Sequence, residues 1–147
     1  MEDKETDALM GYCGLYCGDC LNYKGEIADM ARDLRKKLRE SKFDRVSAGL
    51  SKYVKELNNY EQCYEVLGGM VRLRCKRGCR NGGGNPGCKI RNCCIKKGIE
   101  GCWECGDVED CSKHDFLKTI HEDACIKNLK KIKTAGVDGF IDGKRYW

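Results

Sequence analysis

The stretch CKRGCRNGGGNPGCKIRNCCIKKGIEGCWECGDVEDC, residues 75–111, decides what kind of fold this chain adopts. It holds eight of the thirteen cysteines, many glycines and the only proline of the chain. Such a segment has few large apolar side chains, so packing alone does not hold it together. Bonds between thiolates and a metal ion supply the missing stability, and the segment therefore predicts metal binding.

Apolar residues recur at helical spacing on both sides of this segment. Before it, we expect helices over 24–40 and 43–57 and a third helix that ends at Gly68 and Gly69. Only residues 70–74 have any strand character. After it, we expect a helix over 113–134 that ends at Gly136. The sequence thus predicts a mainly α fold, with helices around a cysteine-rich, metal-stapled irregular segment.

The chain has 147 residues, which is the size of one domain. We expect residues 1–10, MEDKETDALM, to be a flexible tail and residues 11–147 to form a single metal-binding domain. The tail is acidic and polar, unlike an export signal, and no apolar run is long enough to span a membrane. We therefore expect a cytoplasmic protein in which thiols stay reduced, and the odd number of cysteines also argues against closed disulfides.

The net charge of +5 is explained without a polyanionic partner. A zinc ion held by four thiolates carries a net charge of about −2, because the thiol ligands must lose their protons. Two such sites lower the charge from +5 to about +1. The basic excess is therefore close to what two thiolate sites balance.

The strongest metal-binding pattern is CWECGDVEDC, residues 102–111. Its C-x2-C spacing lets two thiolates reach one metal ion from a single turn, as in zinc knuckles. We assign three ligands here: Cys102, Cys105 and Cys111. The fourth ligand stays open between Cys93, Cys94 and His114. A histidine that opens a helix more often has a solvated or capping role.

Two further groups of cysteines have spacings that suit a metal. The first allows a four-thiolate site of its own: Cys75, Cys79, Cys88 and Cys93. The second is the box CGLYCGDC, whose C-x3-C-x2-C spacing radical enzymes use to hold an iron–sulfur cluster: Cys13, Cys17 and Cys20. A catalytic barrel of about 200 residues does not fit here, so we expect a distant cysteine to complete the box. Cys63 and Cys125 lie on helical patterns, and we interpret them as small buried hydrophobic residues.

Three other signals have structural explanations. GGGNPG, residues 82–87, follows no strand, which makes it a turn rather than a dinucleotide-binding loop. The nine Lys and Arg residues between 72 and 97 balance thiolate charge, and contacts with nucleic-acid phosphates are the alternative. No aromatic residue lies in that range, so base stacking is not expected there. No nucleophile–base pair or acid pair stands out, which argues against an enzyme.

The order of the motifs resembles a cysteine-rich family of bacterial and archaeal proteins known only as a domain of unknown function. Three stretches carry the resemblance: CGLYCGDCLNY, CKIRNC followed by KGIEGCWEC, and NLKKIKTAGVDGF. The resemblance implies metal binding, with zinc as the metal, and implies no activity. Carried over by position, the recurrent cysteines of the family are Cys13, Cys17, Cys20, Cys75, Cys79, Cys88, Cys93, Cys102, Cys105 and Cys111.

These patterns together predict a zinc-binding protein with two zinc ions per chain. We expect a non-catalytic interaction module that presents a stable surface to a protein partner, with nucleic acid as a weaker alternative. The rival hypothesis is an iron–sulfur protein that carries electrons or senses redox state, since thiolates serve both metals. The ferredoxin spacing C-x2-C-x2-C-x3-C-P is missing, which favours zinc.

Overall fold

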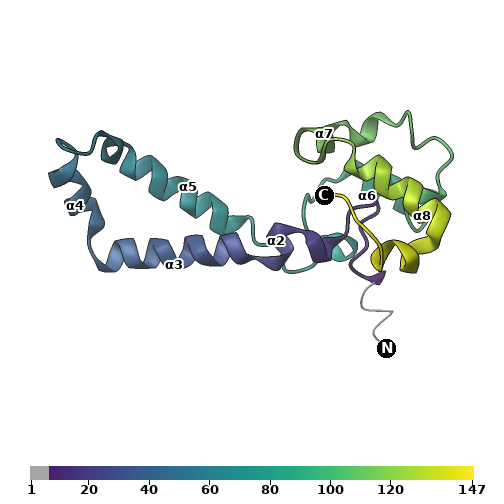
Figure 1. The fold of residues 1–147 in the computed structure, drawn as a ribbon, viewed down its shortest axis with the longest axis horizontal. Coiled ribbons are helices and arrows are strands. Elements are labelled where there is room, and N and C mark those ends of the chain that lie inside the picture. Colours follow the sequence, from purple (N-terminus) through teal and green to yellow (C-terminus); the bar gives the residue numbers. More distant parts are fainter. Residues whose placement is uncertain (1–6) are drawn as a thin grey trace. The chain divides into compact units, whose positions relative to one another are not determined.

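The computed structural model describes residues 7–147, and helices dominate it (Figure 1). Within these residues the only β pairing is an isolated antiparallel bridge between Met10 and Tyr16, so the mainly α prediction is confirmed. None of the helices described over 7–147 combines the length and apolar character that a membrane crossing requires. The chain divides into two compact units. We call residues 24–75 the hairpin unit, and residues 7–23 with 76–147 the cysteine-rich unit.

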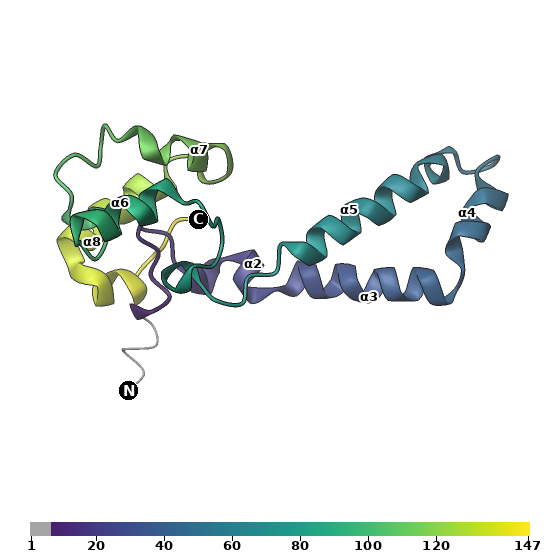
Figure 2. The ribbon, with the colours of Figure 1, turned by 180° about the vertical axis from the view of Figure 1, so that it is seen from behind.

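The hairpin unit consists of two long helices joined by a helical tip (Figures 1 and 2). Its elements in chain order are α3 (Glu26–Glu40), α4 (Phe43–Leu50), the 3-10 helix η2 (Lys55–Asn59) and α5 (Tyr60–Arg72). Helices α3 and α5 lie side by side in both views and run in opposite directions. The chain turns from α3 into α4 at Lys42, which has the left-handed φ of 52°.

Polar and aromatic side chains, rather than a large apolar core, join α3 to α5. Arg39 donates a hydrogen bond to the Tyr64 hydroxyl at 3.1 Å, and the Arg35 guanidinium lies 4.3 Å from the centre of the Tyr64 ring. Gly68 faces Arg35, since a Cβ there would come within 3.1 Å of the guanidinium. The buried residues of the three helices are all small: Ala28, Ala31, Ser47 and Gly68.

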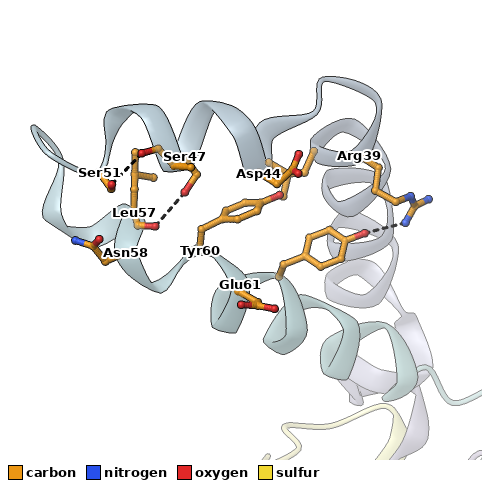
Figure 3. Close-up of a pocket in the computed structure, with 11 residues that line it drawn as sticks. Arg39, Asp44, Ser47, Ser51, Leu57, Asn58, Tyr60 and Glu61 are labelled. Carbon is orange, nitrogen blue, oxygen red and sulfur yellow. Dashed lines mark hydrogen bonds between the residues drawn. The ribbon is translucent and has the colours of Figure 1, made fainter.

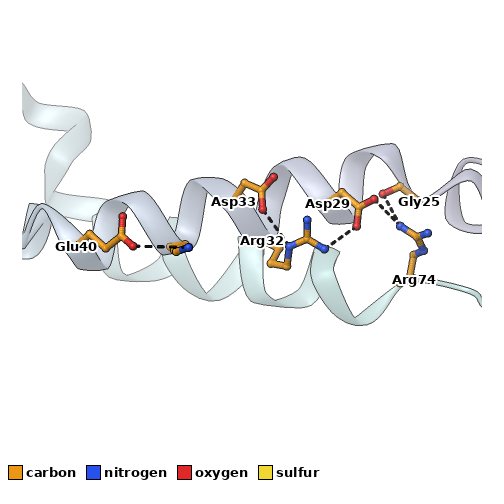
Figure 4. Close-up of polar contacts among 7 residues, drawn as sticks. Gly25, Asp29, Arg32, Asp33, Glu40 and Arg74 are labelled. Atoms are coloured by element: carbon orange, nitrogen blue, oxygen red, sulfur yellow. Dashed lines mark hydrogen bonds and ion pairs between the residues drawn. The ribbon is translucent and has the colours of Figure 1, made fainter.

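A polar clasp closes the base of the hairpin (Figure 4). Arg74 donates hydrogen bonds to Asp29 Oδ2 at 2.6 Å and to the Gly25 carbonyl at 3.3 Å. Gly25 has a φ of 77°, and a Cβ there would lie only 2.0 Å from Arg74 Nη1, so this position requires glycine. The hydrogen bond from Arg74 lowers the pKa of Asp29. Arg32 adds ion pairs of 3.0 Å to Asp29 and to Asp33.

The cysteine-rich unit packs around its C-terminal helix, α8 (Ala124–Ile141). Leu129 is 0% exposed and belongs to one apolar cluster, while Ile132 and Phe140 join Met10 in a second cluster. The other elements are short: the 3-10 helices η1 (Cys17–Asp19), η3 (Cys79–Asn81), η4 (Cys102–Glu104) and η5 (Ser112–His114), and the α-helices α6 (Lys89–Lys97) and α7 (Asp115–His121). Helix α2 (Leu21–Lys24) lies where the sequence passes from this unit into the hairpin unit.

The buried guanidinium of Arg91 holds the glycine-rich loop at residues 79–86. Its Nη1 donates to the carbonyls of Cys79 at 3.0 Å and Gly83 at 2.8 Å. Its Nη2 donates to the carbonyls of Asn85 at 2.8 Å and Pro86 at 3.2 Å. The loop is thus folded back onto α6 by one side chain, in agreement with its prediction as a turn.

Three predicted helix boundaries are wrong. The helix expected over 43–57 ends at Leu50, and the separate 3-10 helix η2 follows it. Helix α5 continues through Gly68 to Arg72, because the missing Cβ lets Arg35 pack there, and the strand expected near 70–74 does not form. The helix expected over 113–134 is two helices, since the chain turns at Glu122 with a φ of 50°. Gly136, with φ 73° and ψ 174°, interrupts helical structure as expected, but the helix resumes and runs to Ile141.

The described residues cover only part of the predicted tail. Residues 1–6 of the tail expected over 1–10 lie outside the described residues. Residues 7 and 8 are exposed, but Leu9 and Met10 are held in place. Met10 is buried and its carbonyl accepts a hydrogen bond from Arg80, and the Leu9 carbonyl accepts one from the Cys17 N–H. Residues 11–147 belong to two compact units, and their folding as a single domain stays a prediction.

Asn128 on α8 fastens the C-terminal segment to the core. The fully buried Asn128 donates from Nδ2 to the Tyr146 carbonyl at 2.8 Å, and its Oδ1 accepts from the Tyr146 N–H at 2.9 Å. The neighbouring Arg145 donates to both carboxylate oxygens of Asp19, at 2.6 and 3.0 Å. The two ends of the cysteine-rich unit are therefore joined through polar contacts.

We predict that Asn128→Ala lowers the free energy of unfolding by about 1–3 kcal/mol, because the two backbone groups of Tyr146 lose their partners. Urea unfolding followed by circular dichroism measures this. Asn92→Ala is the matched control, since Asn92 is exposed on α6, and its expected effect is within about 0.5 kcal/mol. Equal effects of the two substitutions would contradict the role assigned to Asn128.

Candidate metal centre

Five cysteines and one histidine line a single cavity of about 310 Å³ in the cysteine-rich unit. Cys93 and Cys94 come from α6, which ends at Gly98 in the left-handed conformation. The other donors come from two tight turns that follow α6 in the chain: Cys102, Cys105, Cys111 and His114. The structure therefore brings together the whole C-x2-C-x5-C pattern and all three candidates for the fourth ligand.

Backbone hydrogen bonds fix the two turns that carry the donors. The Cys105 N–H donates to the Cys102 carbonyl at 3.1 Å, which closes the turn predicted from the C-x2-C spacing. The His114 N–H donates to the Cys111 carbonyl at 3.2 Å in the same way. The donors thus come in pairs that are three residues apart, each pair held by one 3-10 turn.

The thiols of the cavity differ in their acidity. Cys94 and Cys102 are buried with their sulfur atoms 3.7 Å apart, and burial raises the pKa of both thiols. Cys105 is more open. A hydrogen bond from the Asp107 N–H, together with the Lys97 ammonium group 3.4 Å away, lowers the pKa of its thiol. Cys105 therefore ionises more readily than Cys94 and Cys102.

His114 is buried, which corrects the solvated or capping role expected for it. The residue is 3% exposed, and neither ring nitrogen has a hydrogen-bond partner. Burial lowers the pKa of its imidazole, so the ring is neutral at physiological pH and keeps a lone pair on one nitrogen. A buried, neutral imidazole without a partner among thiols has the chemistry of a metal ligand.

The opening box is split between two sets of neighbours. Cys13 donates a hydrogen bond to the buried Cys125, and this bond and then burial raise the pKa of the Cys13 thiol. Cys17 instead accepts a hydrogen bond from the backbone N–H of Cys79 at 3.3 Å. Cys20 follows directly after η1, and its N–H donates to the Cys17 carbonyl. Cys17 thus contacts the predicted ligand Cys79, and Cys13 packs against the apolar cluster that contains Cys102.

The remaining cysteines have varied surroundings. Cys88 packs against the apolar cluster that contains Ile90 and Leu129, and Cys75 is the last residue of the hairpin unit. Cys125 is buried as expected, whereas Cys63 on α5 is exposed, which corrects the burial expected for it. Over residues 7–147, no three His, Cys, Asp or Glu side chains converge closely enough to hold a metal ion as they stand. The ten ligand assignments stay predictions.

Two arginines of the basic stretch have structural partners. Arg91 holds the loop at 79–86, as described above. Arg80 donates to the carbonyls of Met10 at 2.9 Å and Glu100 at 2.6 Å, and its guanidinium lies 4.3 Å from the centre of the Tyr12 ring. These two side chains therefore stabilise the fold, and they are not part of an open basic surface.

A second hollow lies in the hairpin unit at its tip and measures about 740 Å³ (Figure 3). Tyr60 and Tyr64 both line it with their ring centres 6.2 Å apart, and Asp44 lies beside Tyr60. Ser47 donates to the Leu57 carbonyl at 3.0 Å, which ties α4 to η2. The hollow has no cysteine or histidine in its lining, so it is not a candidate metal site.

The fold and the cavity define a mainly α-helical, cysteine-rich protein. The chain belongs to a family of proteins of unknown function, DUF3795, whose model matches residues 9–116. The matched region contains the opening box, the cysteine-rich segment and His114, whereas α8 lies beyond it. The resemblance to a family of unknown function is thereby confirmed. No curated protein and no solved structure matches the chain.

In metal-free, reduced protein, Cys105 should react with iodoacetamide before Cys94 and Cys102, because the thiolate is the reactive form. Its pKa is lowered and its side chain is accessible, while the other two thiols are buried. Mass spectrometry of peptides after short exposure measures the order. Lys97→Gln should slow the reaction of Cys105 and leave the others unchanged. Faster labelling of Cys102 would contradict the assignment.

The buried His121 makes stability depend on pH. Burial lowers the pKa of this histidine below its ordinary value of about 6.5, and its Nδ1 has no partner. The unfolded chain therefore binds more protons than the folded chain, so the free energy of unfolding falls as pH drops below about 6.5. His121→Phe keeps a ring against Trp147 and should make this pH dependence shallower, as urea midpoints between about pH 7.5 and 5 would show. An unchanged slope would contradict it.

Proposed function

We propose that this chain is a zinc-binding protein that acts as a non-catalytic interaction module. The observation that carries the proposal is the cavity lined by Cys93, Cys94, Cys102, Cys105, Cys111 and His114. In a reducing environment, such a concentration of sulfur donors around a neutral imidazole is the donor set of structural zinc sites. Small rotations of side chains then bring the donors onto the ion, since metal binding and local folding are coupled.

The first zinc ion has Cys93, Cys102, Cys105 and Cys111 as its proposed ligands. Cys105 supports this assignment, because its thiol already ionises more readily than an ordinary thiol. Zinc binding removes the proton of Cys102, whose thiol pKa is otherwise raised by burial. His114 lies in the same lining and is the alternative fourth ligand.

A second zinc ion is proposed near Cys17, Cys20 and Cys79. The hydrogen bond from the Cys79 N–H to Cys17 Sγ shows that the box and the η3 turn meet within the cysteine-rich unit. Gly78, with a φ of 72°, lets the backbone make this approach. N–H···S bonds of this kind also favour the thiolate form of a cysteine, as a metal ligand requires. The fourth ligand then comes from Cys13 or Cys88.

Four protein ligands close the coordination sphere of zinc and leave no position for a substrate. The proposed role is therefore structural, with the zinc ions supplying the stability that a glycine-rich segment lacks. The stable surface that results would bind another molecule. We also propose a cytoplasmic location, because reduced thiols persist there.

Elemental analysis of protein purified without oxygen tests the metal. We expect about two zinc ions per chain, the number proposed from four ligands each. Iron with acid-labile sulfide and a broad visible absorbance would support the iron–sulfur alternative and overturn the zinc proposal.

Substitution then tests the site. Cys105→Ser and Cys111→Ser should each lower the zinc content by about one ion per chain, because a three-ligand site binds zinc far less tightly. Cys63→Ser is the matched control, since this exposed cysteine lies in the hairpin unit and should leave the zinc content unchanged. His114→Phe separates the two ligand sets, since it lowers the zinc content only if the imidazole is a ligand. Unchanged zinc in both Cys105→Ser and Cys111→Ser would contradict the site.

A further inference from the structure

The hairpin unit leaves its large apolar side chains exposed. Its helices bury only alanine, serine and glycine, and no large apolar side chain. On α3, Met30 is 65% exposed, and Ile27 and Leu34 are each more than two-fifths exposed. These three residues have the i, i+3, i+7 spacing of an apolar stripe that packs against another helix. The stripe therefore needs a partner that the hairpin does not itself supply.

The geometry of the hairpin places a matching stripe on α5. One row of residues on α3, which includes Ala31, faces α5. Each residue of the apolar stripe comes one position before a residue of this row, as Met30 comes before Ala31. On α5, Leu67 and Cys63 likewise come one position before Gly68 and Tyr64, which face α3. A step of one residue turns the side-chain direction by about 100° around the helix axis. Because α3 and α5 are antiparallel, a step of one residue toward the N-terminus turns the side chains of both helices to the same face of the pair. The hairpin thus has one apolar face, built from both helices.

The charges beside the stripe favour a second copy of this chain as the partner. Glu26 and Lys37 lie on the same edge of the stripe, 11 residues or about 16 Å apart. When two α3 helices pair antiparallel, Glu26 of each copy comes opposite Lys37 of the other. The same register brings Met30 to within one residue of Leu34, an offset of about 1.5 Å along the axis. Neither Glu26 nor Lys37 takes part in an ion pair among the described residues.

We propose that the hairpin unit dimerises with a second copy of this chain, α3 against α3 in antiparallel orientation, to form a four-helix bundle. Two helical hairpins that pair in this way bury both apolar faces, and the contact is symmetric, as in most homodimers. The 15 residues of α3 span about 22 Å, so the pair buries on the order of 1,000 Å². That is the lower range of specific interfaces, and dimerisation should depend on protein concentration over the micromolar range.

The proposal is independent of the zinc sites. All residues that carry it belong to the hairpin unit, whereas the cavity and the opening box belong to the cysteine-rich unit. An experiment can therefore exclude the dimer without excluding zinc binding, and it can exclude zinc binding without excluding the dimer.

Sedimentation velocity of the full chain over a concentration series tests the dimer. The wild type should change from monomer to dimer as its concentration rises, and Met30→Glu should weaken the dimer at least about tenfold, because it places a charge in the centre of the face. Ile120→Glu is the matched control, since Ile120 is 73% exposed but lies on α7 of the cysteine-rich unit. It should leave dimerisation unchanged.

A charge exchange tests the antiparallel register. Lys37→Glu should weaken the dimer several-fold by placing like charges opposite each other, and Glu26→Lys together with Lys37→Glu should restore much of the loss. The two positions are too far apart to interact within one helix, so recovery requires a contact between copies. Circular dichroism checks that each variant keeps its helices. A monomer at every concentration, equal effects of Met30→Glu and Ile120→Glu, or a double variant that dimerises no better than Lys37→Glu alone overturns the proposal.

Discussion

The buried guanidinium of Arg91 supports the least regular part of the molecule. The loop at 79–86 has glycine, asparagine and proline where a stable loop would have apolar anchors, and four of its carbonyl groups turn inward. One cation satisfies all four, and its own burial is tolerable because Nη1 and Nη2 each have two acceptors. Arg91 is also on α6, just before Cys93 and Cys94. The same helix therefore anchors the loop and forms one wall of the cavity.

The thiol-lined cavity depends on this arrangement. Two short turns after α6 present Cys102, Cys105 and Cys111, and Lys97 lies near enough to Cys105 to favour its thiolate. The pKa values of neighbouring thiols are shifted in opposite directions. Burial keeps Cys94 and Cys102 protonated, while Cys105 ionises readily. In the proposed zinc site, the metal ion would take the place of the protons on these thiols. This competition makes it a place where metal binding and local folding depend on each other.

The sequence predicted those features that short-range spacing determines. The period of α3 and the turn between Cys102 and Cys105 are properties of a few neighbouring residues, and both agree with the structure. The burial of His114 could not be predicted in this way, because it depends on how η5 folds against α6. A paired glycine such as Gly68–Gly69 usually ends a helix, and here the close approach of Arg35 gives it a packing role instead. Tertiary contacts decided each of these cases.

The clasp at the base of the hairpin has a topological consequence. Arg74 ties the last turns of the hairpin unit to Gly25 and Asp29 at its start, so the chain leaves and returns at one place. The hairpin unit is thus an insertion in the sequence of the cysteine-rich unit, whose residues before 24 and after 75 form one compact body. Adding or removing whole turns of both α3 and α5 changes the length of the hairpin and keeps the contacts of Arg74 at its base. The length of the hairpin can therefore vary independently of the cysteine-rich unit.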